Sequence, residues 1–543
     1  MEKVVQWWTY TNGRTRLWHL WLVLGLAAIC AATFAMGVPP LRIYGHDVFI
    51  CLDGAWRVMN GQKPILDFYA AKGPLWFLFY GAFLKLAGGN AQALCYGASS
   101  LAIVMSLWSY FLLRRRMQPV PCALACVSLV LLAVSPFPLG ESPRLTSFAM
   151  TFNRYGFALV SLVFLECFLH SASGDRKSWQ FASGVSSGVA SAIAIFVKIS
   201  YGFVGLFLIA ISLLFRFRER LRAVGILAGF AAVALPVLAY LGFDIRAIVS
   251  EYQYLASARM ASAPLAADLF ARAFNERWQY LLVVLLALVV AFQFAASRRR
   301  AILISAALLA VFCGFFLLVT NAQYSGTPLV AFAALLLLNE VTQSASFKIS
   351  HPSTGVKWAC LLCLCVGLLL SGSAALKDGE GMAYAMTYKF RLPQPFDRLR
   401  SAGMNSLRFL GNSRNDYSDG SDFVEVTDEG MELVRENSSP SETVRALTNT
   451  NAFSIALARK PPRGGAIDIN LGDVSETKYV PLDYLLGDVD LILIPKFPGA
   501  FVDREAEKYI LSEYRDVLDR EYVFVAESQH WRLLRKRSLE PVR

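Results

Sequence analysis

Apolar segments of about 20 residues recur along the chain as far as residue 376 and then stop. A helix of this length spans the hydrocarbon core of a bilayer, so the pattern predicts an all-α polytopic membrane bundle. The first segment follows Lys3, Arg14 and Arg16 and is longer than the core of a signal peptide, which indicates an uncleaved anchor. About eleven spans are predicted, at 17–37, 92–113, 120–138, 156–170, 181–197, 201–215, 223–241, 279–296, 301–320, 328–340 and 358–376.

The apolar stretch Pro74–Leu86 is too short to cross a bilayer, and we expect it to form a juxtamembrane helix in the first outside loop. Without it in the span count, the short basic loops all fall on one side: 114–116, 175–177, 216–222, 298–300 and 348–357. Because such loops stay in the cytoplasm, we expect a bacterial inner-membrane protein with a cytoplasmic N-terminus. The periplasmic face then receives the segments 38–91, 139–155, 198–200, 242–278, 321–327 and all residues from 377.

The residues after the last span have the composition of a small soluble domain. We therefore divide the chain into a transmembrane catalytic domain, 1–376, and a periplasmic C-terminal domain, 377–543. Apolar runs and periodicity predict a strand at 491–495, an amphipathic helix at 501–519, and a hairpin from 522–526 and 531–534. The polar stretch 411–440 is predicted to be loop. This pattern favours a small α+β domain.

Composition and charge agree with a membrane location. Hydrophobic residues make up 56% of the chain and charged residues 17%, which excludes an ordinary soluble globular protein. Residues 1–375 hold 29 Lys and Arg against 13 Asp and Glu, a net charge of +16. The positive net charge of the whole chain, +12, therefore comes from the membrane part. It is typical of an orientation signal and of contact with anionic lipid, and no nucleic-acid partner is expected. The ten cysteines lie mostly in apolar segments, where we expect packing rather than disulfides or metal ligation.

Chemically active side chains gather in the loop after the first span, residues 44–88. It carries three carboxylates and a lysine beside aromatic residues: Asp47, Asp53, Asp67, Tyr69 and Lys72. Most connections between helices are far shorter. We therefore expect this loop to form half of an active site at the membrane surface.

The run Asp47, Gly61-Gln-Lys-Pro-Ile-Leu-Asp67-Phe-Tyr and Lys72-Gly-Pro74-Leu resembles the first periplasmic loop of the GT-C superfamily of polytopic glycosyltransferases. That superfamily includes protein O-mannosyltransferases and lipid A aminoarabinose transferases. Two positions depart from its pattern. Val48 stands where many relatives carry a second acidic residue, which puts metal assistance in doubt, and Lys-Gly-Pro replaces Lys-Pro-Pro.

The resemblance implies an enzyme that transfers a sugar from a polyprenyl-phosphate donor to a hydroxyl on an envelope glycan, lipid or protein, with inversion. One carboxylate must accept the hydroxyl proton, and cations must hold the leaving phosphate. Asp47 is the first candidate for the base and Asp53 the second. Alternatively, Asp47 caps the following helix, and Asp67 orders its own turn. Lys72 matches the family lysine near the donor phosphate, or it snorkels at the interface. A divalent cation is possible but not required by the motif.

Further candidates for substrate binding lie at the outside ends of other spans: Arg144, Arg154, Lys198, Tyr201, Gln323 and Tyr324. Lys and Arg there can hold a phosphate, and an ionisable residue at a helix end in a membrane is a functional candidate by default. The alternatives are snorkelling for Lys198 and a plain turn around Gln323. We expect Glu166, near the cytoplasmic end of its span, to be a buried structural partner of a basic residue.

Three other functions remain open. A transporter or flippase of lipid-linked sugars would show charged or broken helices at mid-membrane and paired repeats. A polymerase or ligase of lipid-linked sugars would have a large outside loop late in the chain. A binding subunit without catalytic activity would not need the carboxylates and cations of the periplasmic segments. We therefore expect a glycosyltransferase.

Overall fold

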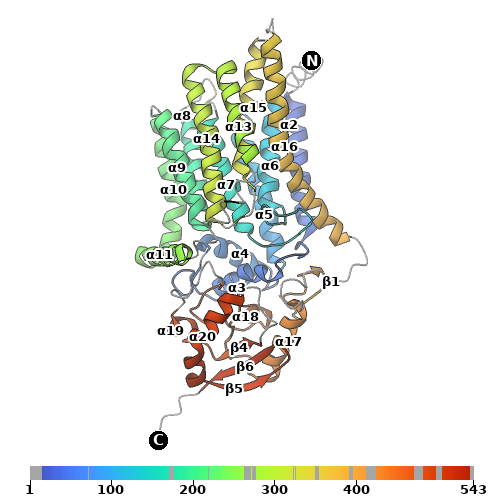
Figure 1. Ribbon diagram of the computed structural model, residues 1–543, viewed down its shortest axis with the longest axis vertical. Coiled ribbons are helices and arrows are strands. Elements are labelled where there is room, and N and C mark those ends of the chain that lie inside the picture. Colours follow the sequence, from blue (N-terminus) through green and yellow to red (C-terminus); the bar gives the residue numbers. More distant parts are fainter. Residues whose placement is uncertain are drawn as a thin grey trace.

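The computed structural model describes residues 15–70, 72–169, 177–217, 219–261, 271, 277–321, 323, 326–348, 354–390, 396–410, 423–469, 481–496 and 504–537. Within these residues, the protein consists of a long helical bundle with a small domain of strands and short helices below one end (Figure 1). The first outside loop lies between the two. This arrangement confirms the predicted fold class.

The bundle helices coincide with the predicted spans. They are α2 (Thr15–Met36), α5 (Ala93–Leu113), α6 (Pro119–Val134), α7 (Thr151–Phe168), α8 (Lys177–Val197), α9 (Ile199–Phe215), α10 (Arg220–Tyr240), α13 (Arg277–Phe294), α14 (Ser297–Thr320), α15 (Pro328–Lys348) and α16 (Thr354–Phe390). Among the described residues, six of these helices are long and apolar enough to cross a membrane.

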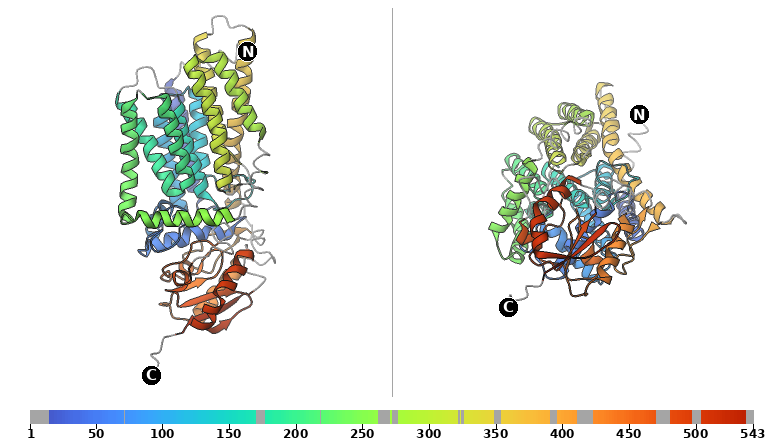
Figure 2. Two further views of the ribbon diagram at one scale, coloured as in Figure 1. Left: turned by 60° about the vertical axis from the view of Figure 1, so that its left-hand side comes forward. Right: turned by 60° about the horizontal axis from the view of Figure 1, so that its bottom comes forward.

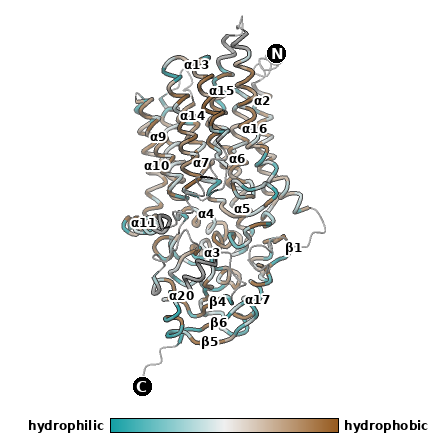
Figure 3. Tube along the Cα trace, in the orientation of Figure 1, coloured by the Kyte–Doolittle hydropathy of each residue, from teal (hydrophilic) through white to brown (hydrophobic). Residues whose placement is uncertain are grey.

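The helices of the bundle are made largely of hydrophobic residues (Figure 3). Large hydrophobic side chains on several helices are exposed to the surroundings: Trp21, Phe203, Leu227, Phe312 and Leu369. A contiguous apolar surface of this kind is not stable in water, and lipid is the environment that it fits. The chain is therefore a multi-pass membrane protein.

Arginines from three basic loops meet at the C-terminal end of α7. Arg116 donates to the carbonyls of Glu166 and Leu169 (3.2 and 3.1 Å), and Arg299 donates to that of Phe168 (2.7 Å). Arg222 also donates to the Glu166 carbonyl (3.2 Å). The last carbonyls of a helix lack partners within it and carry the negative end of its dipole. These contacts place the basic loops at one end of the bundle, as predicted.

The side chain of Glu166 belongs to the same arginine cluster. Its carboxylate is buried, accepts a hydrogen bond from Ser187 (2.7 Å), and lies close enough to Arg116 and Arg222 to interact with both charges. The prediction that Glu166 is a buried structural partner of basic residues is confirmed.

Glycines bring α8 and α10 into close contact. A Cβ atom on Gly184 would lie 2.2 Å from the Arg222 carbonyl oxygen, and one on Gly188 would lie 2.1 Å from that of Ile226. On the facing helix, Gly225 and Gly229 meet α8 backbone oxygens equally closely. Small residues four apart allow helices in lipid to pack backbone to backbone. This packing fixes the position of α8, whose C-terminal end directly precedes Lys198.

The first outside loop folds into short helices at the other end of the bundle. These are the 3₁₀ turn η1 (Gly45–Asp47), α3 (Val48–Met59) and α4 (Pro74–Leu86), so the juxtamembrane helix is confirmed. A further helix, α11 (Ile245–Ala261), lies across the same end of the bundle, crossing the direction of the long helices (Figure 2). Together, these helices form a layer between the bundle and the C-terminal domain.

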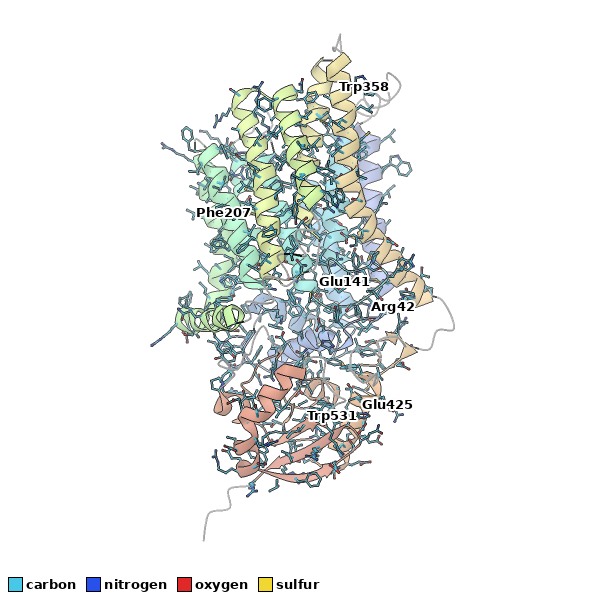
Figure 4. All side chains as sticks on the ribbon, in the orientation of Figure 1. Arg42, Glu141, Phe207, Trp358, Glu425 and Trp531 are labelled. Atoms are coloured by element: carbon cyan, nitrogen blue, oxygen red, sulfur yellow. The ribbon has the colours of Figure 1, made fainter. Side chains whose placement is uncertain are left out.

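The last bundle helix does not end at 376 but continues to Phe390. Its extension is held by polar contacts on both sides: Arg154 of α7 pairs with Asp378 at 2.9 Å, and Arg42 donates to the Tyr388 hydroxyl. Arg42 and Glu141 lie near the end of the bundle that faces the C-terminal domain, and Trp358 at the opposite end (Figure 4). The helix therefore leads directly down to the C-terminal domain.

The C-terminal domain is built on a four-stranded sheet in the order β3-β4-β6-β5, in which β3 and β4 are parallel and the other pairs antiparallel. Its elements are β1 (Phe396–Asp397), β2 (Phe409–Leu410), α17 (Phe423–Glu436), β3 (Val444–Ala446), α18 (Phe453–Ala456), α19 (Leu482–Leu486), β4 (Leu491–Pro495), α20 (Arg504–Glu521), β5 (Tyr522–Glu527) and β6 (Trp531–Lys536). The strand, helix and hairpin predicted after residue 490 are confirmed.

Side chains on successive positions of β4 face opposite layers, as a strand requires. Leu491 and Leu493 pack with α17 and α18, whereas Ile492 packs with α20. The prediction of loop for 411–440 is wrong over α17. That helix buries one apolar face, including Val426 and Met431, while acidic residues on its other face make the segment look polar.

The C-terminal domain is fastened to the first outside loop by buried polar contacts. Arg57 of α3 donates to the carbonyls of Pro462 (2.8 Å) and Gly464 (3.2 Å), and its Nε pairs with Asp53 at 2.8 Å. Tyr69 extends this junction, since its amide donates to the Gly465 carbonyl at 2.9 Å. Loop and domain are therefore one structural unit.

Candidate active site at the membrane surface

Two lysines from separate elements meet at one aromatic ring. The ammonium groups of Lys72, just before α4, and Lys198, between α8 and α9, lie 5.7 and 4.7 Å from the ring centroid of Phe152 on α7. Both lysines are more than nine-tenths buried. Lys198 also donates to the Asn153 side-chain oxygen (3.3 Å), and Lys72 pairs with Asp468 of the C-terminal domain. We call these two residues the lysine pair.

The glycine after Lys72 allows this meeting. The Gly73 amide donates to the Val197 carbonyl (2.9 Å), directly before Lys198. A Cβ atom on Gly73 would lie 2.1 Å from the carbonyl oxygen of Phe196, far inside a normal contact. Lys-Gly-Pro in place of Lys-Pro-Pro thus has a physical reason in this chain, because only a residue without a side chain lets the loop approach the α8 end so closely.

Several polar atoms of residues close in sequence or in space to the lysine pair are buried and have no hydrogen-bond partner among the residues that the structure describes. They are the Trp76 indole nitrogen, the Asn153 side-chain nitrogen, the Tyr201 hydroxyl and both polar atoms of Gln323. Trp76 packs edge-on against Phe152 at 5.3 Å, and the Tyr201 amide donates to the Lys198 carbonyl (3.1 Å).

Gln323 is brought to the same region by its neighbour Asn321, which accepts a hydrogen bond from Ser200 of α9 (3.2 Å). Leaving a buried donor without an acceptor costs about 1–3 kcal/mol, so native sites with several such donors are fitted to a ligand or to water. Two of these donors lie beside the lysine pair, because Trp76 packs on Phe152 and Asn153 accepts a hydrogen bond from Lys198. The arrangement therefore suits an anion.

Strained backbone flanks the site. Met150, immediately before α7, and Tyr44, immediately before η1, have φ of 55° and 53°. Ile65 in the first loop has φ of 75°, which is unusual for a β-branched residue. Such conformations persist only where the surrounding structure enforces them, and they concentrate at functional sites.

Asp47 ends η1 at the start of α3. Its carboxylate is partly buried, with 16% of the side chain exposed, and its Oδ1 lies 3.1 Å from His46 Nε2. It makes no capping hydrogen bond to α3, although it occupies the N-cap position. The capping role is therefore not used, and the carboxylate is engaged by a histidine instead. Val48 and Phe49, which follow it, belong to the same buried cluster as Phe152 and Trp76.

Asp53 has a different environment. It is fully buried and holds Arg57, which fastens the C-terminal domain. Arg445 shares this junction by donating to the Gly464 carbonyl (2.7 Å), and burial together with the charge of Arg57 lowers the pKa of Arg445 to about 9. The structure thus places Asp53 in the attachment between loop and domain.

Asp67 and Tyr69 also shape the junction. The Asp67 carboxylate accepts a hydrogen bond from the Lys63 amide (2.7 Å), which orders the turn as the alternative prediction had it. The Tyr69 ring stacks on Tyr254 of α11 and meets Tyr484 edge-on, both at 5.1 Å. Burial and the nearby Glu251 carboxylate raise the pKa of Tyr69.

The remaining candidates lie apart from these contacts. Arg154 is buried and donates to the carbonyls of Phe137 and Leu132 besides pairing with Asp378. Arg144 is exposed, with its guanidinium 5.3 Å from the ring centroid of Tyr384. Each of these two arginines also contacts the α16 extension, Arg154 through Asp378 and Arg144 through Tyr384. Tyr324 lies outside the described residues.

Sequence reasoning missed two residues of the site. Asp468 follows no motif and is separated from Lys72 by almost 400 positions, so only the fold reveals the pair. Phe152 is one of many aromatic residues in apolar segments, and nothing local marks it. Within the described residues, no group of three His, Cys, Asp or Glu side chains could hold a metal ion.

No protein-family model and no curated protein matches the sequence. Among solved structures, the chain is similar to ArnT from Cupriavidus metallidurans bound to undecaprenyl phosphate, with 12% identity, 96% of this chain and 98% of that chain covered, and a TM-score of 0.48. It is also similar to the Archaeoglobus fulgidus oligosaccharyltransferase in complex with zinc and sulfate, with 14% identity, coverage of 87% and 67%, and a TM-score of 0.43.

Proposed function

We propose that this protein is a glycosyltransferase that moves a sugar from a polyprenyl-phosphate carrier to a hydroxyl acceptor at the outside face of the membrane. The observation that carries the proposal is the lysine pair at Phe152, with the buried donors of Trp76 and Asn153 beside it, which have no partner among the described residues. Two cations in a largely dry site fit a phosphate group. A phosphate attached to a polyprenyl chain reaches such a site from the lipid beside the bundle.

The chemistry of the transfer assigns a role to Asp47. The acceptor hydroxyl attacks the anomeric carbon while Asp47 takes its proton. The bond between the anomeric carbon and the phosphate oxygen breaks, its electron pair leaves with the phosphate, and the proton remains on the carboxylate. The capping bond that would compete for this oxygen is not made. His46 orients the carboxylate from 3.1 Å.

The lysine pair stabilises the departing charge. Phosphate is already a good leaving group, so its oxygen needs no general acid, but its growing negative charge needs fixed cations. Lys72 and Lys198 are held by different elements and therefore contact the group from two directions. In this proposal, Tyr201 and Gln323 contribute neutral hydrogen bonds to the same phosphate or to the sugar.

The test compares the wild-type protein with Asp47→Asn in liposomes supplied with a panel of polyprenyl-phosphate sugars and scores release of polyprenyl phosphate. We expect release by the wild type and a loss of about 100-fold or more in the variant, because asparagine keeps the shape but takes no proton. Asp53→Asn is assayed in parallel as the second candidate, with folding of each variant followed by its melting temperature.

Full activity of Asp47→Asn would remove Asp47 from the mechanism and make Asp53 the next candidate. A wild type that carries the lipid across the bilayer without releasing polyprenyl phosphate would overturn the enzyme in favour of a flippase.

A further inference from the structure

The contact between Lys72 and Asp468 joins the C-terminal domain to the lysine pair. Asp468 is 2% exposed, and its Oδ2 pairs with the Lys72 ammonium. It is carried by the segment that pairs with the first outside loop, where the Ile467 amide donates to the Tyr69 carbonyl (3.3 Å). The domain therefore holds a carboxylate against one of the two cations that the proposed function assigns to the donor phosphate.

A carboxylate and a phosphate cannot both neutralise the same ammonium at full strength. Lys72 provides a single charge, and a second anion beside Asp468 would be repelled in a site where water does little screening. Lys198, in contrast, donates a hydrogen bond to the neutral Asn153 oxygen (3.3 Å). The two lysines thus differ in one partner, a carboxylate for Lys72 and a neutral amide for Lys198.

We propose that Asp468 is an exchangeable counter-ion of Lys72, displaced when the lipid phosphate binds and restored when it leaves. This inference rests on the proposed function, because it assigns the phosphate to the lysine pair. The donor is a phosphodiester with one negative charge, whereas the released polyprenyl phosphate carries about −1.5 to −2 near neutral pH. The product would therefore be held more tightly than the donor. A carboxylate that returns to Lys72 offsets this and promotes product release.

Two further observations fit a partner that can exchange. The pair joins two side chains almost 400 residues apart, so rotation of either side chain separates it without moving the backbone contacts that fasten the domain. Lys72 keeps a second favourable contact, the Phe152 ring, when the carboxylate moves away.

The experiment is a double-mutant cycle with Lys72→Met and Asp468→Asn, using titration of polyprenyl phosphate into the full-length protein in detergent micelles. We expect Lys72→Met to weaken binding and Asp468→Asn to tighten it by at least about tenfold. In the Lys72→Met background, Asp468→Asn should change nothing. In turnover with a polyprenyl-phosphate sugar, Asp468→Asn should lower KM and also lower kcat, because the product leaves more slowly.

Matched variants separate this role from a structural one. Asp468→Glu keeps the charge and should bind polyprenyl phosphate as the wild type does, and Asp468→Ser gives a second neutral variant if the asparagine protein does not fold. Glu442→Gln removes another carboxylate of the same domain, the partner of Arg535 at 2.9 Å, and should leave binding unchanged.

The possible failures are distinguishable. If Lys72→Met binds polyprenyl phosphate as well as the wild type, the phosphate site of the proposed function is wrong. If Lys72→Met weakens binding but neutral variants at 468 bind equally or more weakly than the wild type, the counter-ion proposal alone is overturned.

Discussion

The two ends of the helical bundle both contain buried cations, and the lysine pair at one end differs from the arginines in its partners. At the basic end, Arg116 and Arg299 donate to backbone carbonyls at the end of α7, and Arg299 also pairs with the Glu340 carboxylate at 2.8 Å. At the other end, Arg154 likewise donates to backbone carbonyls, whereas the lysine pair contacts side chains: Phe152, Asn153 and Asp468. Backbone carbonyls cannot move without unfolding the helix, whereas side chains can rotate away.

This difference separates structural cations from cations that can bind a ligand. Arginine presents a rigid fork of donors that can hold several carbonyls at once, whereas lysine is a compact charge on a flexible stem. Burial alone does not distinguish a structural cation from a ligand-binding one, because the arginines and the lysine pair are both almost fully buried. The chemical nature of the partner distinguishes them. The predictions below test the comparison from the largest expected effect to the smallest.

Arg222→Met should cost the most stability and spare lipid binding. Arg222 is 1% exposed, donates to the Glu166 carbonyl (3.2 Å) and lies 3.9 Å from the Glu219 carboxylate, and its charge favours the buried Glu166 carboxylate. A hydrogen bond from a charged group is worth about 1.5–3 kcal/mol, and an acceptor left buried without a donor adds a penalty. We expect the free energy of unfolding in a denaturant titration to fall by about 3 kcal/mol or more, while the folded variant binds polyprenyl phosphate normally.

The control for Arg222→Met is Arg220→Met, at an exposed position of the same loop, which should change little. The comparison between the two ends fails if Arg222→Met binds the lipid phosphate more weakly at equal folded fraction.

Lys198→Met should have the opposite effect to Arg222→Met, because it should weaken lipid binding and leave stability almost unchanged. Methionine keeps the apolar stem against Phe152 but removes the charge. A hydrogen bond to a charged group is worth about 1.5–3 kcal/mol, so we expect polyprenyl phosphate to bind about 10- to 100-fold more weakly. The melting temperature should fall little, since the main partner lost is a neutral amide.

Lys85→Met, at an exposed lysine near the end of α4, controls for the loss of one charge on this face. If Lys198→Met unfolds the protein but the surviving folded fraction binds lipid as the wild type does, Lys198 belongs with the structural arginines.

Gly73→Ala should give the smallest effect and one confined to the site. The added methyl group would meet the Phe196 carbonyl, so the loop must retreat and carry Lys72 away from Phe152. Overpacking of this kind typically costs about 1–3 kcal/mol, and we expect it mainly as a several-fold weaker lipid affinity.

Gly372→Ala in α16 is the matched substitution, because a Cβ there meets no atom within 4 Å. It should be neutral or slightly stabilising, as alanine favours a helix. Equal lipid binding by Gly73→Ala and the wild type would show that the close approach does not position Lys72.

Prediction from sequence succeeded where the signal is local. Apolar segments of sufficient length located the bundle helices, and basic loops such as 114–116 and 298–300 were placed correctly at one end. It failed where burial depends on tertiary partners. The acidic face of α17 concealed its apolar face, and α16 continued past the end of its apolar run because Arg154 pairs with Asp378.

The amino-acid sequence by itself determined that this is a polytopic membrane protein, which of its loops are basic, and which loop concentrates carboxylates and Lys72. Hydropathy and charge are properties of individual residues, so they can be read directly from the sequence. Only the tertiary structure decided that Lys72 and Lys198 share one phenylalanine, that Asp53 holds the arginine that fastens the C-terminal domain, and that Asp468 reaches Lys72. Those outcomes depend on the packing of elements far apart in sequence, which no local pattern encodes.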